Sequence, residues 1–242
     1  MIEFLKNKSV ALVGPAKYMS GSNYGVEIDS HDVVVRINRG IESIKSYGDD
    51  IGKRTDIYYS CLIETSQQTG KLDVVELKDD YKIKYIVAPP ESDFIGMSSK
   101  TDFHSLVDKS KMESFKKHIP IRIIEHDFHT DLAREVRCKP NTGFLSIYDL
   151  LRFDIKKLSI YGFSFYLDGF LPGQKDGVIY EKGCSEQEFA NMGFNSKRHI
   201  QVNMWNYAKQ TLRNNPKVVL DGTLTQILNL KKFNKEEFRN EV

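Results

Sequence analysis

Two stretches of the sequence combine glycines and small polar side chains in an order that suits the binding of a phosphate. The first lies between two apolar runs and contains Gly14, Gly21, Ser22 and Gly25. A glycine-rich turn at the carboxyl end of a parallel strand can bring backbone N–H groups against a phosphate, because glycine has no Cβ. The run is neither G-x-G-x-x-G nor a Walker loop, so an ordinary strand–loop connection is the alternative interpretation.

The second stretch is Asn141-Thr142-Gly143, which precedes an apolar run with helical spacing. Asn141 or Thr142 would make a good N-cap, and the start of the helix would offer free N–H groups to an anion. Capping alone explains these residues equally well. Gly162 follows another apolar run, where its backbone would let a ribose or a base approach closely.

Two further side chains could take part in chemistry with such a ligand. His199 begins a helical stretch, and a neutral histidine near pH 7 can accept a proton from a sugar hydroxyl; a surface or capping role is the alternative. Asn38 follows the second apolar run, and its amide could bond a phosphate or a base edge, or form a turn. We interpret His31 and Arg36 as structural, with Asp29 and His31 bonding to backbone groups of a turn.

A metal site is the weaker interpretation of a third cluster. His126 and His129, with Asp127 and Asp131 nearby, would share one face of a helix. No third ligand has a clear spacing, and no Asp-x-Asp follows a predicted strand. The sequence therefore predicts no metal.

These residues must be positioned by elements that meet at one edge of a sheet. Short apolar runs predict strands at Val10–Val13, Val33–Ile37, Asp56–Ser60, Ile83–Ala88, Ile121–Ile124, Leu158–Tyr161 and Val218–Leu220. Helical spacing is found in Phe103–Lys117, Phe128–Val136, Phe144–Phe153 and Arg198–Leu212. This alternation predicts a doubly wound α/β fold with a mostly parallel sheet. Gly14, Asn38 and Gly162 would then share a crevice beyond the strand ends.

Length and composition favour a soluble globular enzyme or binding module. The 242 residues predict a single domain over 1–242, and a net charge of +2 gives no general attraction to nucleic acid. Cys61, Cys138 and Cys184 lack metal-ligand spacing, so we expect three free thiols in a reducing compartment.

Three segments are predicted to lie outside the regular elements. The glycine-rich stretch 168–185 is long enough to be an active-site lid, and Glu91–Lys100 is a smaller loop. The charged tail from Lys231 onward is predicted to lie at the surface. The first residues contain no apolar run long enough for a signal peptide or a membrane span, so we expect a cytoplasmic protein.

The same residues resemble the motifs of the eukaryotic-type sialyltransferase family. The match to the large sialylmotif consists of Gly14, Ser20-Gly21, Gly25, Ile28-Asp29-Ser30-His31-Asp32 and Arg36-x-Asn38. The match to the small sialylmotif consists of Pro140-Asn141-Thr142-Gly143-Phe144-Leu145 and Leu158-Ser159-Ile160-Tyr161-Gly162-Phe163. His199 falls where the very small motif has its catalytic histidine. The blocks occur in family order across most of the chain.

The resemblance implies a fold, a donor and a set of site residues. The fold would be Rossmann-like, a variant of the single-domain glycosyltransferase A fold, and the donor would be a CMP-sugar that needs no metal and no other cofactor. His199 would be the general base. Donor contacts would come from Gly14, Ser22, Asn38, Asn141, Thr142, Gly143, Gly162 and Phe163.

The chain departs from the family pattern at several positions. Pro15 stands where the family usually has an asparagine, and it lacks both the amide and a backbone N–H, so that contact is not carried over. The family's second histidine, which assists the departing phosphate, is missing; Tyr180, Lys182 and Arg198 are the candidates to replace it. The disulfide of secreted members would align with Val10 and Ile155, which are apolar here.

The function implied is the transfer of sialic acid, or of the related sugar Kdo, from a CMP donor to a glycan hydroxyl with inversion. The acceptor would be an oligosaccharide, a lipopolysaccharide or a capsule-type glycan, and a lipid-linked acceptor would place the enzyme peripherally at a membrane. Two alternatives stay open. One is a transferase that uses another nucleotide-sugar, and the other is a non-catalytic module that binds a nucleotide or a glycan.

Overall fold

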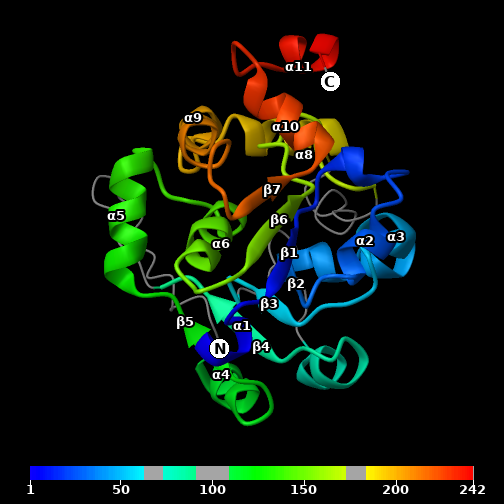
Figure 1. Cartoon of the computed structure of the whole chain (residues 1–242), viewed down its shortest axis with the longest axis vertical. Helices are drawn as coiled ribbons and strands as arrows, with labels where there is room; N and C mark the ends of the chain where they lie inside the picture. Colours follow the sequence, from blue (N-terminus) through cyan, green and yellow to red (C-terminus); the bar gives the residue numbers. More distant parts are fainter. Residues whose placement is uncertain (63–72, 91–108, 173–183, 242) are drawn as a thin grey trace.

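The computed structural model describes residues 1–62, 73–90, 109–172 and 184–241. Its centre is a seven-stranded sheet in the order β5-β4-β3-β2-β1-β6-β7, in which all neighbouring strands are parallel (Figure 1). The strands are β1 (Ser9–Val13), β2 (Val33–Ile37), β3 (Ile57–Tyr59), β4 (Tyr85–Ala88), β5 (Ile121–Ile123), β6 (Lys157–Tyr161) and β7 (Val218–Leu220). All seven predicted strands are present, and the predicted parallel α/β fold is confirmed.

The helices follow the strands along the chain. They are α1 (Ile2–Leu5), α2 (Gly25–Asp29), α3 (Ile44–Ile51), α4 (Lys109–Lys116), α5 (His126–Val136), α6 (Thr142–Leu151), α8 (Glu186–Phe194), α9 (Gln201–Thr211), α10 (Gly222–Asn229) and α11 (Lys235–Glu241), with short helical turns η1 (Lys17–Met19), η2 (Asn38–Ile41) and η3 (Glu76–Asp80). The helix predicted from Arg198 begins at Gln201, and the first residues of the helix predicted at 103–117 lie outside the described residues. The sequence did not predict the helices α1, α2, α3, α8, α10 and α11, because short or polar helices carry a weak apolar pattern.

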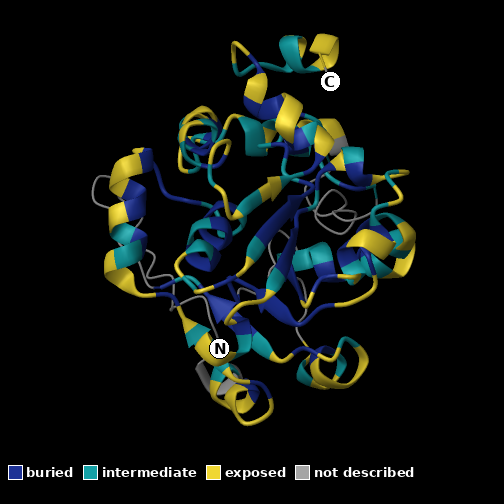
Figure 2. Cartoon of the chain, viewed as in Figure 1, coloured by how far each residue is buried: buried dark blue, intermediate teal, exposed yellow. Residues whose placement is uncertain are grey.

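Helices cover both faces of the sheet because successive strand residues point in opposite directions. On β1, Val10 and Leu12 belong to the core cluster that includes residues of α6, α9 and α10. Ala11 and Val13, between them in sequence, belong to the cluster that includes Ile28 of α2 and the end of α3. The central strands are therefore buried on both sides, as the dark blue centre of Figure 2 shows, whereas the edge strands β5 and β7 are partly exposed.

The strand order contains one topological switch point. From β1 the chain winds outward through β2, β3 and β4 to β5, and it then returns to place β6 on the other side of β1. The connections after β1 and β6 therefore leave in opposite directions, so a ligand crevice is expected beyond the carboxyl ends of these two strands. Ligands of doubly wound sheets bind at such a point.

The Asp29–Asp32 turn and Arg36 have structural roles, as predicted. The Asp29 carboxylate accepts hydrogen bonds from the N–H groups of Lys53 and Arg54. His31 is buried, with Nδ1 3.0 Å from the Glu27 carbonyl oxygen and Nε2 2.9 Å from Ser159 Oγ. Arg36 is buried too, and its Nη2 donates to two backbone carbonyls of the segment that follows α3. These bonds fix how β2 sits beside its neighbours.

The cysteine expectations hold for the described structure. Cys61, Cys138 and Cys184 are free thiols. Val10 and Ile155, where the resemblance places the disulfide of secreted members, are both buried in the main core cluster. These two positions therefore contribute apolar packing to the core.

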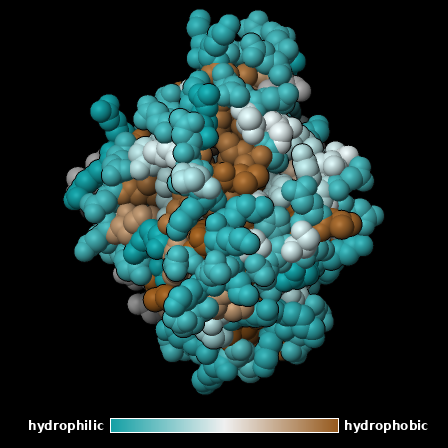
Figure 3. Space-filling model, viewed as in Figure 1, coloured by the Kyte–Doolittle hydropathy of each residue, from teal (hydrophilic) through white to brown (hydrophobic). Residues whose placement is uncertain are grey.

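The surface offers no simple guide to function. The face in Figure 3 is mostly hydrophilic, and its hydrophobic residues form separate patches. Across residues 1–62, 73–90, 109–172 and 184–241, none of the helices combines the length and the apolar character needed to cross a membrane.

Candidate active site

Gly14 and Gly162 hold the carboxyl ends of β1 and β6 unusually close. The Gly14 N–H donates to the Tyr161 carbonyl at 2.7 Å, and the Ala16 N–H donates to the Gly162 carbonyl at 3.0 Å. A Cβ on Gly14 would lie 2.3 Å from the Gly162 oxygen, and Gly162 itself has a φ of +75°. Both positions therefore require glycine. Pro15 fits at the next position because only its carbonyl takes part in a hydrogen bond. This carbonyl accepts the Leu171 N–H at 2.8 Å.

This geometry corrects the expectation that the first loop presents N–H groups to a phosphate. The donors of Gly14 and Ala16 are already bonded to β6, and the Tyr18 N–H donates to the Asp168 carboxylate at 2.7 Å. Gly14 therefore contributes close approach and not hydrogen-bond donors. Ser22 also points to other partners, since its hydroxyl is 3.2 Å from the Asp50 carbonyl at the end of α3.

The ring of Phe163 brings the predicted residues of β1, β6 and α6 together. A Cβ on Gly14 would lie 2.9 Å from the ring, and a Cβ on Gly143 would lie 3.2 Å from Phe163 Cε1. The same Gly143 position is 3.5 Å from Ile37 Cδ1, at the end of β2. Gly14, Gly143, Gly162 and Phe163 thus line one crevice at the switch point.

The amino terminus of α6 opens into this crevice. Asn141 is the N-cap, and its Oδ1 accepts the Phe144 N–H at 2.8 Å, which confirms the predicted cap. The next two N–H groups, of Thr142 and Gly143, have no hydrogen-bond partner among the described residues. Free N–H groups at the start of a ten-residue helix form a site for an anion.

His199 lies beside the start of α6. Its Nδ1 is 2.8 Å from the carbonyl oxygen of Lys139, two residues before the Asn141 cap, and its backbone N–H donates to Ser196 Oγ at 3.0 Å. A carbonyl only accepts, so Nδ1 carries the proton and Nε2 keeps its lone pair. Burial, together with the nearby charges of Arg198 and Lys139, lowers the pKa of His199 to about 4, although the hydrogen bond to the Lys139 carbonyl acts in the opposite direction. This pKa is well below the ordinary histidine value of about 6.5.

Asn38 lies at the end of β2 with one half of its amide in use. Its Oδ1 accepts the Cys61 N–H at 3.2 Å, and its φ of +44° is the left-handed conformation that asparagine tolerates. The turn-forming role is thus confirmed. The Nδ2 group has no partner among the described residues, so it can still donate to a ligand.

A buried network that sequence reasoning missed supports the crevice from behind. Asp221 Oδ2 accepts both the Gly162 N–H and the Tyr18 hydroxyl at 2.8 Å, and the Tyr18 oxygen in turn accepts the Phe163 N–H at 3.0 Å. Burial raises the pKa values of Tyr18 and Asp221. The available signal was an aspartate directly after the strand Val218–Leu220, where it caps α10.

Several predicted residues cannot be placed in the site. Tyr180, Lys182 and most of the proposed lid 168–185 lie outside the described residues, as does Glu91–Lys100. The start of the lid is described: Phe170 forms an antiparallel bridge with Ala16, which sets it across the first loop. Arg198 is exposed, and its carbonyl accepts the Lys139 N–H at 3.2 Å.

The histidine pair on α5 does not form a metal centre in the part of the chain that the structure describes. Among those residues no three His, Cys, Asp or Glu side chains are close enough to hold an ion. His126 is exposed beside Asp127, whereas His129 is 1% exposed and neither of its ring nitrogens has a partner.

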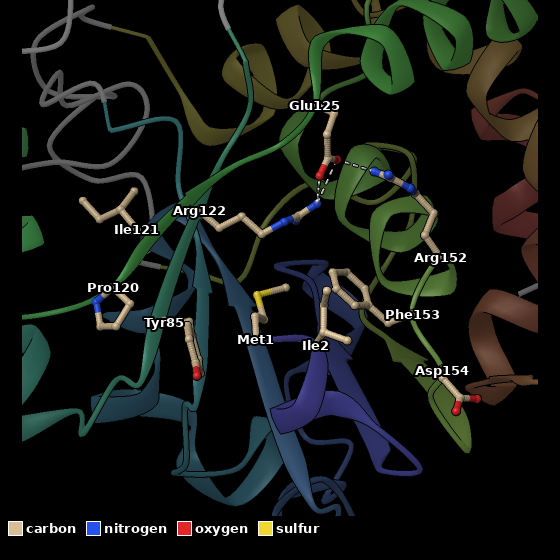
Figure 4. A pocket seen from close by; sticks show the side chains of 10 residues that line it. All are labelled: Met1, Ile2, Tyr85, Pro120, Ile121, Arg122, Glu125, Arg152, Phe153 and Asp154. Atoms are coloured by element: carbon tan, nitrogen blue, oxygen red, sulfur yellow. Dashed lines mark hydrogen bonds and ion pairs between the residues drawn. The ribbon is translucent and has the colours of Figure 1, made fainter.

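A cavity of about 490 Å³ lies at the opposite, amino-terminal edge of the sheet (Figure 4). Tyr85 and Phe153 line it, and Arg122 and Arg152 bind Glu125 at its rim. The two arginines and Glu125 are thus paired with one another, and the strand ends that hold ligands in such folds are on the other side. We therefore place the candidate site at the switch point.

These features define a class: a doubly wound α/β protein whose crevice can hold an anionic ligand next to a proton acceptor. Residues 5–165 match the family model described as glycosyltransferase family 29 (sialyltransferase). The chain therefore belongs to glycosyltransferase family 29, and the resemblance drawn from its motifs is confirmed.

Individual relatives share less of the chain. It is 35% identical over 82 residues to the alpha-N-acetylgalactosaminide alpha-2,6-sialyltransferase 1 of Gallus gallus, a match that spans 32% of this chain and only 14% of that protein. A mammalian sialyltransferase in complex with Gal-beta-1-3GalNAc-ortho-nitrophenol is 16% identical, with 88% of this chain and 69% of that chain covered and a TM-score of 0.47. The Campylobacter jejuni sialyltransferase CstII, in complex with CMP-3FNeuAc, is 15% identical over 84% of this chain and 78% of its own, with a TM-score of 0.47.

Proposed function

We propose that this protein transfers sialic acid from a CMP donor to a hydroxyl group of a glycan acceptor. The observation that carries the proposal is the bond from His199 to the Lys139 carbonyl, which joins a proton acceptor to the start of α6. Family membership supports glycosyl transfer, and the motif residues around Gly143 and Gly162 support a CMP donor. Kdo, the related acid sugar, is the second donor that the motifs allow.

The reaction needs one proton acceptor and one site for the departing phosphate. The acceptor hydroxyl loses its proton to His199 Nε2 while its oxygen bonds to the anomeric carbon. The bond from that carbon to the phosphate oxygen breaks, and CMP leaves with the electron pair. The N–H groups of Thr142 and Gly143 stabilise the negative charge that develops on the phosphate. Attack from the side opposite the leaving group gives inversion.

The residues available argue for a reaction without a metal. The leaving phosphate has helix N–H groups to bind, and among the described residues no group of three or more His, Cys, Asp or Glu side chains could hold an ion. Asn38 Nδ2 is a further donor for the nucleotide. Arg198 is the described candidate for the role of the family's second histidine.

A direct assay tests the proposal. The protein is mixed with CMP-sialic acid or CMP-Kdo and a panel of galactoside acceptors, and CMP release and the glycan product are followed by chromatography and mass spectrometry. Product with either donor supports transfer and selects the sugar. Release of CMP with no change in any acceptor would indicate hydrolysis instead of transfer.

The two rival functions give different results. A thermal-shift panel of CMP, UDP, GDP and NAD identifies the nucleotide, and stabilisation by UDP or GDP alone would favour another nucleotide-sugar donor. Stabilisation by CMP with no turnover of any donor would favour a non-catalytic binding module. Both measurements use the intact chain.

The proposed cytoplasmic location and the membrane-bound acceptor would be tested by fractionating cells that make the protein.

A further inference from the structure

The segment after α10 folds back onto the body of the protein through one aromatic ring. Phe233 stacks on Phe194 at 5.4 Å between ring centroids and 18° between planes, and it packs on Trp205 at 5.4 Å. Its edge meets Phe165 at 6.3 Å. The sequence predicted a charged surface tail from Lys231 onward, which is wrong for Phe233 because this ring packs against the core cluster.

A second anchor in the same segment is Lys235. Its Nζ donates to Asn191 Oδ1 at 2.5 Å and lies 4.9 Å from the centre of the Phe194 ring. The turn that presents these two side chains is itself closed, because the N–H groups of Lys231 and Lys232 donate to the Glu237 carboxylate. The tail is thus attached to α8 at both Asn191 and Phe194.

The elements that Phe233 touches are those that carry the site. Phe165 follows Phe163 on the loop after β6, Phe194 ends α8 five residues before His199, and Trp205 lies on the first turns of α9 just after it. The Phe233 ring therefore connects the loop after β6, whose Phe163 lies beside Gly14 and Gly143, to the segments before and after His199.

The short connection between α8 and α9 is braced internally as well. A Cβ on Gly193 would lie 2.7 Å from the Tyr166 ring, so α8 packs directly on the loop after β6. Gln201 Nε2 donates to the His199 carbonyl at 2.8 Å and to the Gly193 carbonyl at 3.3 Å. A shift of Gly193 or Phe194 would therefore be passed to His199.

We propose that residues 231–235 are a positioning element, in which Phe233 and Lys235 hold the end of α8 so that His199 faces the start of α6. The inference rests on the proposed function of His199 as general base. Phe233 does not touch the substrate in this account; it acts through Phe194 and Phe165. A misplacement of about 1 Å at a catalytic group lowers turnover by up to about 100-fold.

The experiment compares four variants of the full chain by steady-state kinetics, calorimetry with CMP and thermal unfolding. Phe233→Ala removes the ring, Phe233→Tyr restores an aromatic ring, and Lys235→Met removes the second anchor. Phe4→Ala is the control, since Phe4 packs on Tyr85 at 5.3 Å, at the other edge of the sheet. We expect kcat to fall about 10- to 100-fold in Phe233→Ala, with the Kd for CMP within about twofold of the wild type. Phe233→Tyr should restore most of kcat, and Phe4→Ala should leave it unchanged.

A second readout does not depend on turnover. The imidazole of His199 is titrated by NMR in each variant. Its signal is identified as the one that is absent from the spectrum of His199→Ala. If the tail keeps this ring buried, its pKa in Phe233→Ala should move up toward the ordinary value of about 6.5. If the wild type shows no transfer activity but the pKa of His199 still rises in Phe233→Ala, the proposed function is refuted and the positioning by Phe233 stands. An unchanged His199 pKa and an unchanged kcat in Phe233→Ala would overturn the positioning, as would a loss of kcat that only follows the loss of folded protein.

Discussion

His199 and Lys139 are joined by a hydrogen bond of 2.8 Å from the imidazole Nδ1 to the backbone carbonyl. This bond fixes one tautomer, so the lone pair of Nε2 is available to a substrate hydroxyl. It also ties His199, two residues before the start of α9, to Lys139, two residues before the Asn141 cap of α6. A proton acceptor and a helix terminus with free N–H groups are thereby held together by the backbone itself.

The first prediction concerns His199→Ala. The variant should fold and bind CMP, because the free N–H groups of α6 are unchanged, but it should lose transfer by about 10²–10⁴-fold, the contribution of a positioned base. In the wild type, kcat/KM should stay level as the pH falls from 7 and should drop only near a pH of about 4, the pKa of His199. Stopped assays over this pH range, corrected for the folded fraction, measure this decrease in kcat/KM. The decrease should be absent from the residual activity of the variant.

His31→Ala is the matched control for this prediction. His31 bonds to Glu27 and Ser159 inside the fold, so its removal should lower the melting temperature, with activity falling only as folded protein is lost. A stable but inactive His31→Ala beside a fully active His199→Ala would move the chemistry to the first motif.

The second prediction separates the two functions of the Asn38 amide. Asn38→Asp keeps the oxygen that accepts the Cys61 N–H, tolerates the positive φ, and removes the Nδ2 donor. Its thermal stability should stay close to that of the wild type, while CMP binding weakens by about 1.5–3 kcal/mol through the loss of a hydrogen bond to a charged or polar ligand. Asn38→Ala should lose both thermal stability and affinity for CMP. Calorimetry that shows the same CMP affinity in all three proteins would remove Asn38 from the site.

The third prediction is that transfer needs no divalent metal. Activity measured in excess EDTA should equal activity in Mg²⁺ or Mn²⁺, since the phosphate has the N–H groups of Thr142 and Gly143 to bind. Complete loss in EDTA with recovery on adding a metal would contradict this and would direct attention back to His126 and His129.

The fourth prediction is that replacing Gly143 by alanine affects thermal stability and CMP binding in opposite ways. Alanine favours a helix over glycine by about 1 kcal/mol, but a Cβ here would lie 3.2 Å from Phe163 and face the crevice. Gly143→Ala should therefore leave the melting temperature near that of the wild type or above it, while the Kd for CMP rises. Gly222→Ala is the control, because this residue also begins a helix and its Cβ would have 3.9 Å of clearance. Equal loss of CMP binding in the two variants would show that Gly143 has no special contact.

The strands and the site differ in how much of them the sequence reveals. Runs such as Val33–Ile37 are buried on both faces, so composition alone locates them, and the parallel order follows from their alternation with helices. The role of Gly14 could be predicted only in part. Its place after a strand indicates close approach, but whether its N–H is free depends on the pairing with Tyr161, 147 residues away. Long separations in sequence also hide the Asp221 network, whose bonds reach 59 residues to Gly162 and 203 residues to Tyr18.

The fifth prediction concerns His129, whose two ring nitrogens are buried and have no hydrogen-bond partner among the described residues. A buried polar group of this kind destabilises the fold by about 1–3 kcal/mol relative to an apolar group of similar shape. His129→Leu, in which the volume is nearly kept, should therefore raise the free energy of unfolding at pH 7. Chemical denaturation measures the change. His126→Leu, at an exposed position on the same helix, is the control and should have little effect.

Acid should magnify the difference between the wild type and His129→Leu. Burial, together with the nearby charges of Lys139 and His126, lowers the pKa of His129 to about 4, from about 6.5 in the unfolded chain. Between these values the unfolded chain binds a proton that the folded protein does not, so the stability of the wild type falls as the pH drops, by up to about 1.4 kcal/mol per pH unit for this residue. His129→Leu lacks this contribution, and its advantage should grow from pH 6.5 to pH 4. An advantage that stays constant over this range would show that His129 is protonated or partnered in the folded protein. A variant less stable than the wild type at pH 7 would show that the ring nitrogens are satisfied by bound water, which leucine cannot replace.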